Sequence, residues 1–197
     1  DAITVVTNAK FAPRFLAWAE ERGGPVPIEV VDDGTTSEED KLGAIGDLAL
    51  VIRELQVEDD LLVAAGDSLF TERLDGFVRF AEERSAAAIA VYDVGDLEAM
   101  GRLSAVSVDS DSRVTAFEEK PERPASTLAG IALYFYPREV LPLVSEYVGE
   151  GHNPDQPGRF VEWLYSRTPV YAWLVPGRWL DVGTPEALAE ADREFGD

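Results

Sequence analysis

The stretch that decides the fold is DDLLVAAGDSLF, residues 59–70. Five apolar residues, 61–65, stand between a pair of acids and a Gly-Asp step. A continuous apolar run of this length is typical of a parallel strand that is covered on both faces. Ligands of open α/β sheets bind beyond the carboxyl ends of such strands. There Gly66 would let a ligand approach the backbone, and Asp67 offers a carboxylate suited to Mg²⁺. The plainer interpretation is a turn in which Asp67 bonds its own backbone.

The composition indicates a globular and strongly acidic chain. It has 197 residues, 46% of them apolar, and a formal net charge of −21. This length fits one domain over residues 1–197 with a real core. Nucleic acid is not an expected partner, because a polyanion requires a basic face. No apolar run approaches the roughly 20 residues of a membrane span, and no signal-peptide pattern is present. We therefore expect a cytoplasmic protein with no membrane partner.

Residue usage also restricts the chemistry of a site. The chain has no cysteine, which excludes disulfide and thiolate chemistry, and its single histidine, His152, excludes a multi-histidine metal site. Oxygen ligands remain, and these suit Mg²⁺ or Mn²⁺. A phosphorylated ligand would need a local cation, and the lysines are few: Lys10, Lys41 and Lys120.

Strand and helix patterns alternate along the chain. Strands are predicted at 3–7, 27–31, 61–65, 87–92, 128–136, 170–175 and 178–180, and helices at 13–22, 41–55, 74–83, 137–147, 159–167 and 186–195. This alternation predicts βαβ units and an α/β fold with a largely parallel sheet. Residues 104–108 and 113–117, joined by a polar turn, predict a β-hairpin within it.

Two further segments carry candidate functional residues. In FEEKP, residues 117–121, Glu119 and Lys120 should point to opposite faces of a strand unless the backbone bends. From the residues alone, an ordinary surface strand end is the favoured interpretation. In WLDVGT, residues 179–184, Asp181 is a second carboxylate at a strand end, before Thr184 as N-cap. Its alternative role is that of an acid stabilised by the helix dipole.

The segment LGAIG, residues 42–46, places two glycines in the first turn of a predicted helix. Glycine there costs helix stability, so each should have a reason. One reason is close approach of a flat ligand to the backbone, and the other is tight packing of the helix on the sheet. Both remain open from the residues. The polar segment before it, residues 32–40, is predicted to be a solvated loop.

Four motifs in this order resemble the sugar nucleotidyltransferase family, whose members include glucose-1-phosphate thymidylyltransferase and mannose-1-phosphate guanylyltransferase. They are LGAIG at 42–46, Gly66-Asp67 after a strand, FEEKP at 117–121 after a hairpin, and WLDVGT at 179–184. Together they cover nearly the whole chain. The resemblance implies a Rossmann-like mixed, mostly parallel sheet between helices. It also implies transfer of a nucleotidyl group from a nucleoside triphosphate to a sugar 1-phosphate, which gives a nucleotide sugar and pyrophosphate.

By this resemblance the catalytic residues are Asp67, Lys120 and Asp181. The two aspartates would hold Mg²⁺ against the phosphates, and Lys120 would bind the sugar phosphate. Such a site needs positioning and charge neutralisation rather than a protonatable nucleophile. A chain with one histidine and no cysteine therefore meets its requirements.

The resemblance also implies a set of substrate-binding residues. Gly43 would lie against the nucleobase, and Gly66 would allow a ligand near the strand end. Glu119 would bind sugar hydroxyls, and the pocket near Ser104, Glu119 and Gly130 would set the choice of sugar. The sequence does not fix which nucleotide or sugar is used. Members of the family often form dimers or tetramers, so a homo-oligomer is expected.

The chain departs from the family pattern in two places. The family begins with a strand and a glycine-rich loop that holds the triphosphate, and nothing of the kind precedes Asp1, so we expect the chain to be N-terminally incomplete. A Tyr-Gly pair near the sugar is replaced by Leu103-Ser104. Two alternatives follow from these departures: a non-catalytic homologue that binds a nucleotide sugar or regulates a partner, and a fragment that folds only with another chain.

Overall fold

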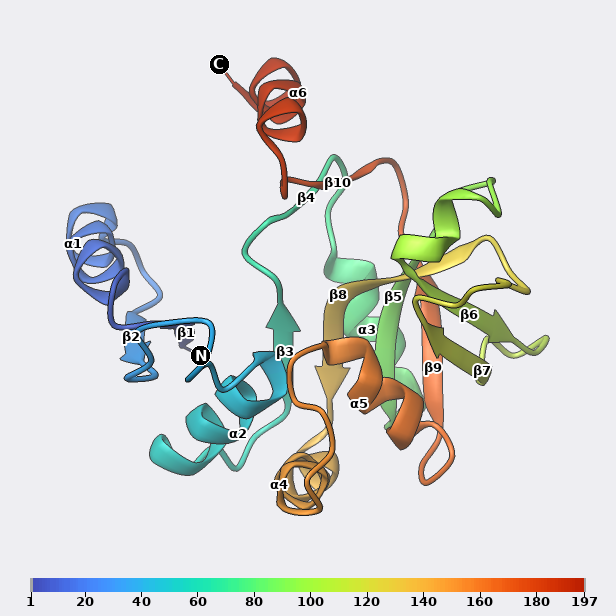
Figure 1. The fold of residues 1–197 in the computed structure, drawn as a ribbon, viewed down its shortest axis with the longest axis horizontal. Helices are drawn as coiled ribbons and strands as arrows, with labels where there is room; N and C mark the ends of the chain where they lie inside the picture. The colour runs from blue at the N-terminus through green and yellow to red at the C-terminus, as the bar shows by residue number, and fades with distance from the viewer. Residues whose placement is uncertain (1, 197) are drawn as a thin grey trace. The chain divides into compact units, whose positions relative to one another are not determined.

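The computed structural model describes residues 2–196, in which strands and helices alternate as far as β3 (Leu61–Ala64) and strands then also follow one another directly (Figure 1). These residues form two compact units. One comprises the chain as far as Glu58 together with Val144–Pro157, and the other comprises Asp59–Leu143 and the chain from Gly158 onward. The expectation of one domain over residues 1–197 stays a prediction.

The first unit is built around a parallel strand pair. Strand β1 (Ile3–Thr7) pairs with β2 (Ile28–Asp32) in register from Ile3↔Ile28 to Thr7↔Asp32, and helix α1 (Ala12–Arg22) connects them. Both strands are rich in β-branched residues, which favour the pleated backbone. Helix α2 (Ala44–Glu54) follows in the chain. The predicted βαβ unit is confirmed, and the carboxyl ends of both strands lie at one edge.

The second unit contains a six-stranded sheet. Its strand order is β7-β6-β8-β5-β9, and β3 also pairs with β8. The bounds are β3 (Leu61–Ala64), β5 (Ala87–Asp93), β6 (Ser104–Val108), β7 (Val114–Glu119), β8 (Leu128–Tyr136) and β9 (Val170–Leu174). Strands β5 and β9 run parallel, whereas β8 is antiparallel to β3, β5 and β6. The predicted mixed sheet and the β6–β7 hairpin are confirmed, and most strand pairs in this sheet are antiparallel rather than parallel.

The remaining elements of the chain are short. They are the two-stranded sheet of β4 (Ser68–Phe70) with β10 (Trp179–Asp181), the helices α3 (Asp75–Arg84), α4 (Leu141–Gly149), α5 (Pro157–Leu164) and α6 (Pro185–Phe195), and the 3₁₀ turns Ala99–Arg102 and Arg138–Val140. The Ala187 N–H donates to Oγ1 of Thr184 over 3.1 Å, as predicted for the N-cap of α6. Within residues 2–196, every helix is too short or too polar to cross a bilayer.

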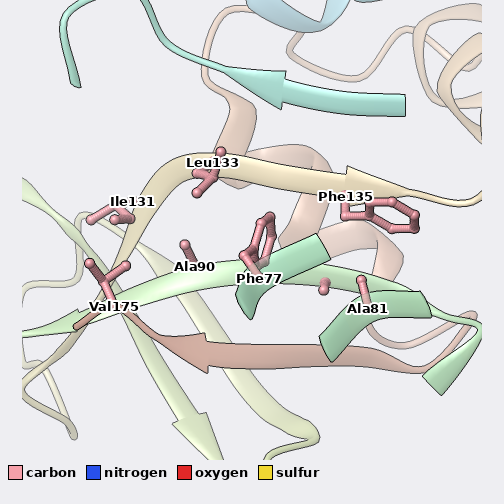
Figure 2. Packing of buried hydrophobic residues seen from close by; sticks show 8 residues of the cluster. Phe77, Ala81, Ala90, Ile131, Leu133, Phe135 and Val175 are labelled. Atoms are coloured by element: carbon pink, nitrogen blue, oxygen red, sulfur yellow. The ribbon is translucent and has the colours of Figure 1, made fainter. Parts of the chain in front are cut away.

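Alternation of side chains along β8 sets the two faces of the sheet. Ile131, Leu133 and Phe135 point to one face, where they pack with Phe77 of α3 (Figure 2). On the other face, the Tyr136 ring lies 5.5 Å from the ring of Phe160 on α5. Helices therefore cover both faces of the sheet, and the predicted α/β class is confirmed.

The prediction for residues 61–65 as a buried parallel strand was wrong. Strand β3 pairs antiparallel with β8, from Leu61↔Tyr136 to Ala64↔Leu133. Its side chains alternate in burial, and Leu62 is 50% exposed. An apolar run reports hydrophobicity but carries no information on the direction of the partner strand. That direction is fixed here by β8, which lies some 70 residues further along the chain.

Truncation of Phe77 tests the core between α3 and the sheet. Its ring is 0% exposed and lies 5.6 Å from the Trp173 ring. We expect Phe77→Ala to lower the free energy of unfolding by about 3–5 kcal/mol, as measured by urea denaturation. Phe195→Ala, at a side chain that is 42% exposed, is the matched control and should cost about 1 kcal/mol or less. Equal losses in the two variants would contradict this assignment of the core.

Candidate functional site

Asp67 and Asp181 are brought together by the small sheet of β4 and β10. The strands are antiparallel with Ser68 opposite Asp181, and the Val182 N–H donates to the Asp67 carbonyl over 2.8 Å. The two aspartates therefore stand one position apart on neighbouring strands. Both residues are exposed. The pairing makes two distant segments backbone neighbours. Because successive residues of a strand point to opposite faces, a site shared by the two carboxylates stays a prediction.

The oxygen chemistry of this pair fits a divalent cation such as Mg²⁺. Hard cations prefer carboxylate oxygens, and Mg²⁺ usually keeps several waters and takes only one or two carboxylates beside substrate phosphates. Across residues 2–196, no group of three or more His, Cys, Asp or Glu side chains gathers to enclose a metal. The role of Asp67 and Asp181 as Mg²⁺ ligands therefore stays a prediction.

Ser104, Glu119 and Gly130 form a row across three strands. Ser104 on β6 stands opposite Glu119 on β7 and opposite Gly130 on β8. The Ser104 hydroxyl donates to Oε2 of Glu119 over 2.5 Å. Ser104 is buried and Glu119 is half-buried. The structure thus brings three of the predicted substrate-binding residues together, although their roles in binding stay predictions.

Lys120 follows Glu119 in a left-handed backbone conformation. Strand β7 ends at Glu119, and Lys120 has φ +50° while its N–H donates to the Leu103 carbonyl over 3.1 Å. A positive φ is uncommon for a residue with a side chain and often marks a functional site. Lys120 is exposed and forms no ion pair with any residue in the range 2–196. The bend removes the strict strand alternation that would send Glu119 and Lys120 to opposite faces.

The glycines at 66 and 130 differ in what surrounds them. A Cβ on Gly66 would meet nothing within 4 Å, and approach of a ligand to Gly66 stays a prediction. A Cβ on Gly130 would lie 3.1 Å from the Phe117 ring and 3.3 Å from Val106. The side-chain space of Gly130 is therefore filled by the hairpin. Substrate binding at Gly130 stays a prediction. Any such binding would have to use the backbone atoms of Gly130.

Gly43 has a packing reason that the sequence did not reveal. Helix α2 begins at Ala44 rather than at Lys41, and Gly43 precedes it with φ +79°. A Cβ on Gly43 would lie 2.6 Å from the Asp155 Cα and 2.7 Å from the Pro154 carbonyl oxygen. The Ile45 N–H donates to that carbonyl over 2.8 Å. Tight packing therefore explains Gly43, although the residue packs on the loop at Pro154 and Asp155 and not on the sheet. Contact of Gly43 with a nucleobase stays a prediction.

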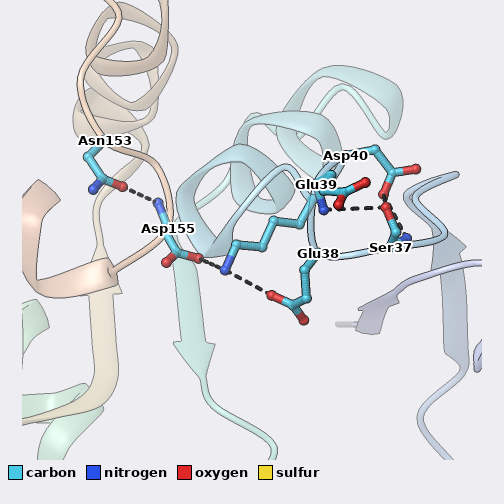
Figure 3. A network of polar contacts seen from close by, with 7 residues as sticks. Ser37, Glu38, Glu39, Asp40, Asn153 and Asp155 are labelled. Carbon is cyan, nitrogen blue, oxygen red and sulfur yellow. Dashed lines mark hydrogen bonds and ion pairs between the residues drawn. The ribbon is translucent and has the colours of Figure 1, made fainter.

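The acidic loop before α2 is held by a hydrogen-bond network (Figure 3). Asp40 accepts from the backbone N–H groups of Thr36 and Ser37 over 3.0 and 2.7 Å, and these bonds lower its pKa to about 2. Nζ of Lys41 lies 3.2 Å from Oε2 of Glu38 and 3.0 Å from Oδ1 of Asp155. Residues 36–40 of the predicted solvated loop are thus tied to one another, and Lys41 bridges Glu38 and Asp155.

A cavity of about 520 Å³ opens in the first unit and was missed by the sequence reasoning. The cavity is lined by the carboxyl ends of β1 and β2, by the loop that precedes α2 and by the first turn of α2. Its lining residues include Asn8, Lys10, Asp33, Lys41 and Asp47. The signal that could have found it is general: ligands of α/β units bind beyond the carboxyl ends of parallel strands, and both strands had been predicted.

One carboxyl group of this cavity has a strongly shifted pKa. Burial raises the pKa of Asp47 from its ordinary 3.8 to about 6. The negative charge of Asp33 and its hydrogen bond with Asp47 contribute to this rise. Oδ1 of Asp47 is buried and makes no hydrogen bond with residues 2–196. Two carboxyl groups that face one another in partial burial cannot both ionise easily.

Comparison with known proteins places this geometry in context. A model of the nucleotidyl transferase family matches residues 1–197. Among solved structures, the fold is similar to that of a protein from Bacillus anthracis described as a glucose-1-phosphate thymidylyltransferase, solved in complex with sucrose. The TM-score is 0.73 and the identity 20%, and the match covers 97% of this chain and 74% of that chain. The likeness confirms the predicted fold of nucleotide-diphospho-sugar transferase type.

Replacement of Asp47 by Asn should change how stability depends on pH. Because the folded state holds this proton more tightly than the unfolded chain, the contribution of Asp47 to stability falls as pH rises from about 4 to about 6. We expect Asp47→Asn to raise the Tm relative to wild type at pH 7 by roughly 2–4 °C, a modest gain because solvent screens the partly exposed group. The gain should vanish at pH 4.

Asp40→Asn is the control, because its effect on the Tm should have the opposite sign to that of Asp47→Asn. The pKa of Asp40 is lowered to about 2, so its stabilisation is present at neutral pH and is lost only as pH falls through that value. This variant should therefore lower the Tm at pH 7. Identical pH profiles of Tm for wild type and Asp47→Asn would show that the Asp47 carboxyl is not strained by burial.

Proposed function

The chain belongs to the nucleotidyl transferase family, and from this premise we propose that it transfers a nucleotidyl group from a nucleoside triphosphate to a sugar 1-phosphate. The observation that carries the proposal is the arrangement within one compact unit. Asp67 and Asp181 are backbone neighbours at the pairing of β4 with β10, Ser104 stands opposite Glu119 on β6 and β7, and Lys120 directly follows Glu119. The first group suits a metal and phosphates, and the second suits the hydroxyls and phosphate of a sugar phosphate.

The reaction joins two anions, so repulsion must be reduced before they can react. A sugar phosphate oxygen attacks the α-phosphorus in line, a new P–O bond forms, and the bond to the bridging oxygen breaks as pyrophosphate leaves on the opposite side. Catalysis of such a transfer is mostly positioning and charge stabilisation. When bound, Mg²⁺ would neutralise phosphate charge.

Each residue has one task in this scheme. Asp67 and Asp181 would hold the metal by their carboxylate oxygens. Lys120, exposed and free of a carboxylate partner within residues 2–196, would neutralise the phosphate of the incoming sugar. Glu119, fixed by Ser104, would accept hydrogen bonds from sugar hydroxyls. No proton has to be removed from the attacking phosphate oxygen, which is ionised at neutral pH.

Asp67→Asn and Asp181→Asn test the catalytic proposal. Each amide keeps the size of the side chain but loses its charge, so we expect pyrophosphate release to fall on the order of a hundredfold or more, as measured with panels of nucleoside triphosphates and sugar 1-phosphates. Asp111→Asn, at an exposed acid in the β6–β7 turn, should leave the rate unchanged. If the aspartate variants keep the wild-type rate, or wild type binds a nucleotide sugar without turnover, a non-catalytic binding role replaces this proposal.

Binding of Mg²⁺ alone gives a readout that needs no turnover. Two neighbouring carboxylates repel one another when no cation lies between them, so Mg²⁺ should raise the Tm of the wild-type chain in proportion to site occupancy. The increase should be lost in Asp67→Asn and Asp181→Asn but kept in Asp111→Asn. An equal Mg²⁺ response in all four proteins would place the metal elsewhere.

A further inference from the structure

Glu119 lies against the first turn of α5, at a glycine. A Cβ built on Gly158 would overlap Oε2 of Glu119, and it would lie 2.9 Å from the Ser104 hydroxyl and 3.1 Å from Cδ of Glu119. Real Cβ atoms do not approach oxygens this closely. Any larger residue at 158 would therefore displace the Glu119 carboxylate, the Ser104 hydroxyl or both.

The backbone at Gly158 gives no other reason for a glycine. The residue is buried and lies within α5, which begins at Pro157. Its conformation is helical, so any residue could adopt it, and alanine would favour the helix more. What remains is the space that the absent side chain leaves for the ends of Glu119 and Ser104.

The surroundings of Glu119 hold one carboxylate oxygen and leave the other available. Oε2 accepts from Ser104 over 2.5 Å and lies beside Gly158. Burial raises the pKa of Tyr134, and the charge of Glu119 raises it further, which places that phenol near the carboxylate. Oε1 accepts no hydrogen bond from a residue within 2–196.

We propose that Gly158 is a positioning residue for Glu119, whose carboxylate takes its orientation from the space at this glycine. The inference rests on the proposed function, in which Glu119 contacts the sugar. A methyl group at 158 would turn the carboxylate out of its place and break its bond with Ser104. Because both displaced groups are the ends of side chains, the chain should still fold.

A double-mutant cycle tests this coupling through kinetics. In Gly158→Ala we expect the KM for the sugar 1-phosphate to rise roughly tenfold or more, as for loss of a hydrogen bond to a charged group, while the KM for the triphosphate stays near the wild-type value. In a Glu119→Ala background, the same change at 158 should add little. Independent, multiplying effects of the two changes would overturn the inference.

A second cycle needs no turnover, because it measures thermal unfolding without substrates. In Glu119→Ala only the Ser104 hydroxyl remains beside Gly158, and without its carboxylate partner it is free to rotate away. Gly158→Ala should then raise the Tm through the better helix propensity of alanine. With Glu119 present, the gain should be smaller or reversed. Gly149→Ala is the matched control at the end of α4, where a Cβ meets nothing within 4 Å, and its Tm shift should be the same in both backgrounds.

The two cycles separate the inference from the proposed function. If no pair of triphosphate and sugar 1-phosphate yields pyrophosphate with the wild-type chain, the proposed function fails. The Tm cycle then decides the inference alone: a background-dependent shift at 158 supports positioning of Glu119, and equal shifts overturn it. If wild type is active and both cycles show no coupling, the proposed function stands and the inference fails.

Discussion

The pairing of β8 with three neighbours is the constraint on which the second unit depends. Its nine residues pair with β5 on one side and with β6 and then β3 on the other. The strict alternation of a strand then divides its side chains between the core with α3 and the face toward α5. Gly130 and Tyr134 lie on this second face, beside Ser104 and Glu119. The strand that anchors the core therefore also supports the candidate sugar site.

Local patterns predicted this architecture well wherever a residue's own neighbours decide its conformation. The bounds of β8 were predicted residue by residue because apolar and β-branched residues run unbroken to Tyr136, where Pro137 stops them. The cap at Thr184 likewise depends only on the next three residues. In both cases the determining contacts lie within a few positions of sequence, and the sequence shows all of them.

Features that depend on distant partners were not predictable in this way. The antiparallel direction of β3 comes from β8, and the fit of Gly43 comes from Asp155. Asp67 and Asp181 were each predicted to be a carboxylate at a strand end. Their segments become neighbours only through the pairing of β4 with β10, which the sequence does not show. The sequence analysis allowed for a bend at Lys120 but did not predict its left-handed backbone. Residues before proline rarely adopt that conformation.

Net charge links the proposed chemistry to this arrangement. A chain of charge −21 repels phosphorylated substrates, yet salt screens exposed charges beyond about 8–10 Å, so the groups nearest the phosphates dominate. Of the three lysines, Lys41 is held by two carboxylates and Lys10 lies 5.1 Å from the Phe11 ring. Lys120 forms no ion pair within residues 2–196, which is why the proposal assigns it to a phosphate. Asp67 and Asp181 would add negative charge where the proposed reaction places phosphates, which is the physical reason for proposing a divalent cation there.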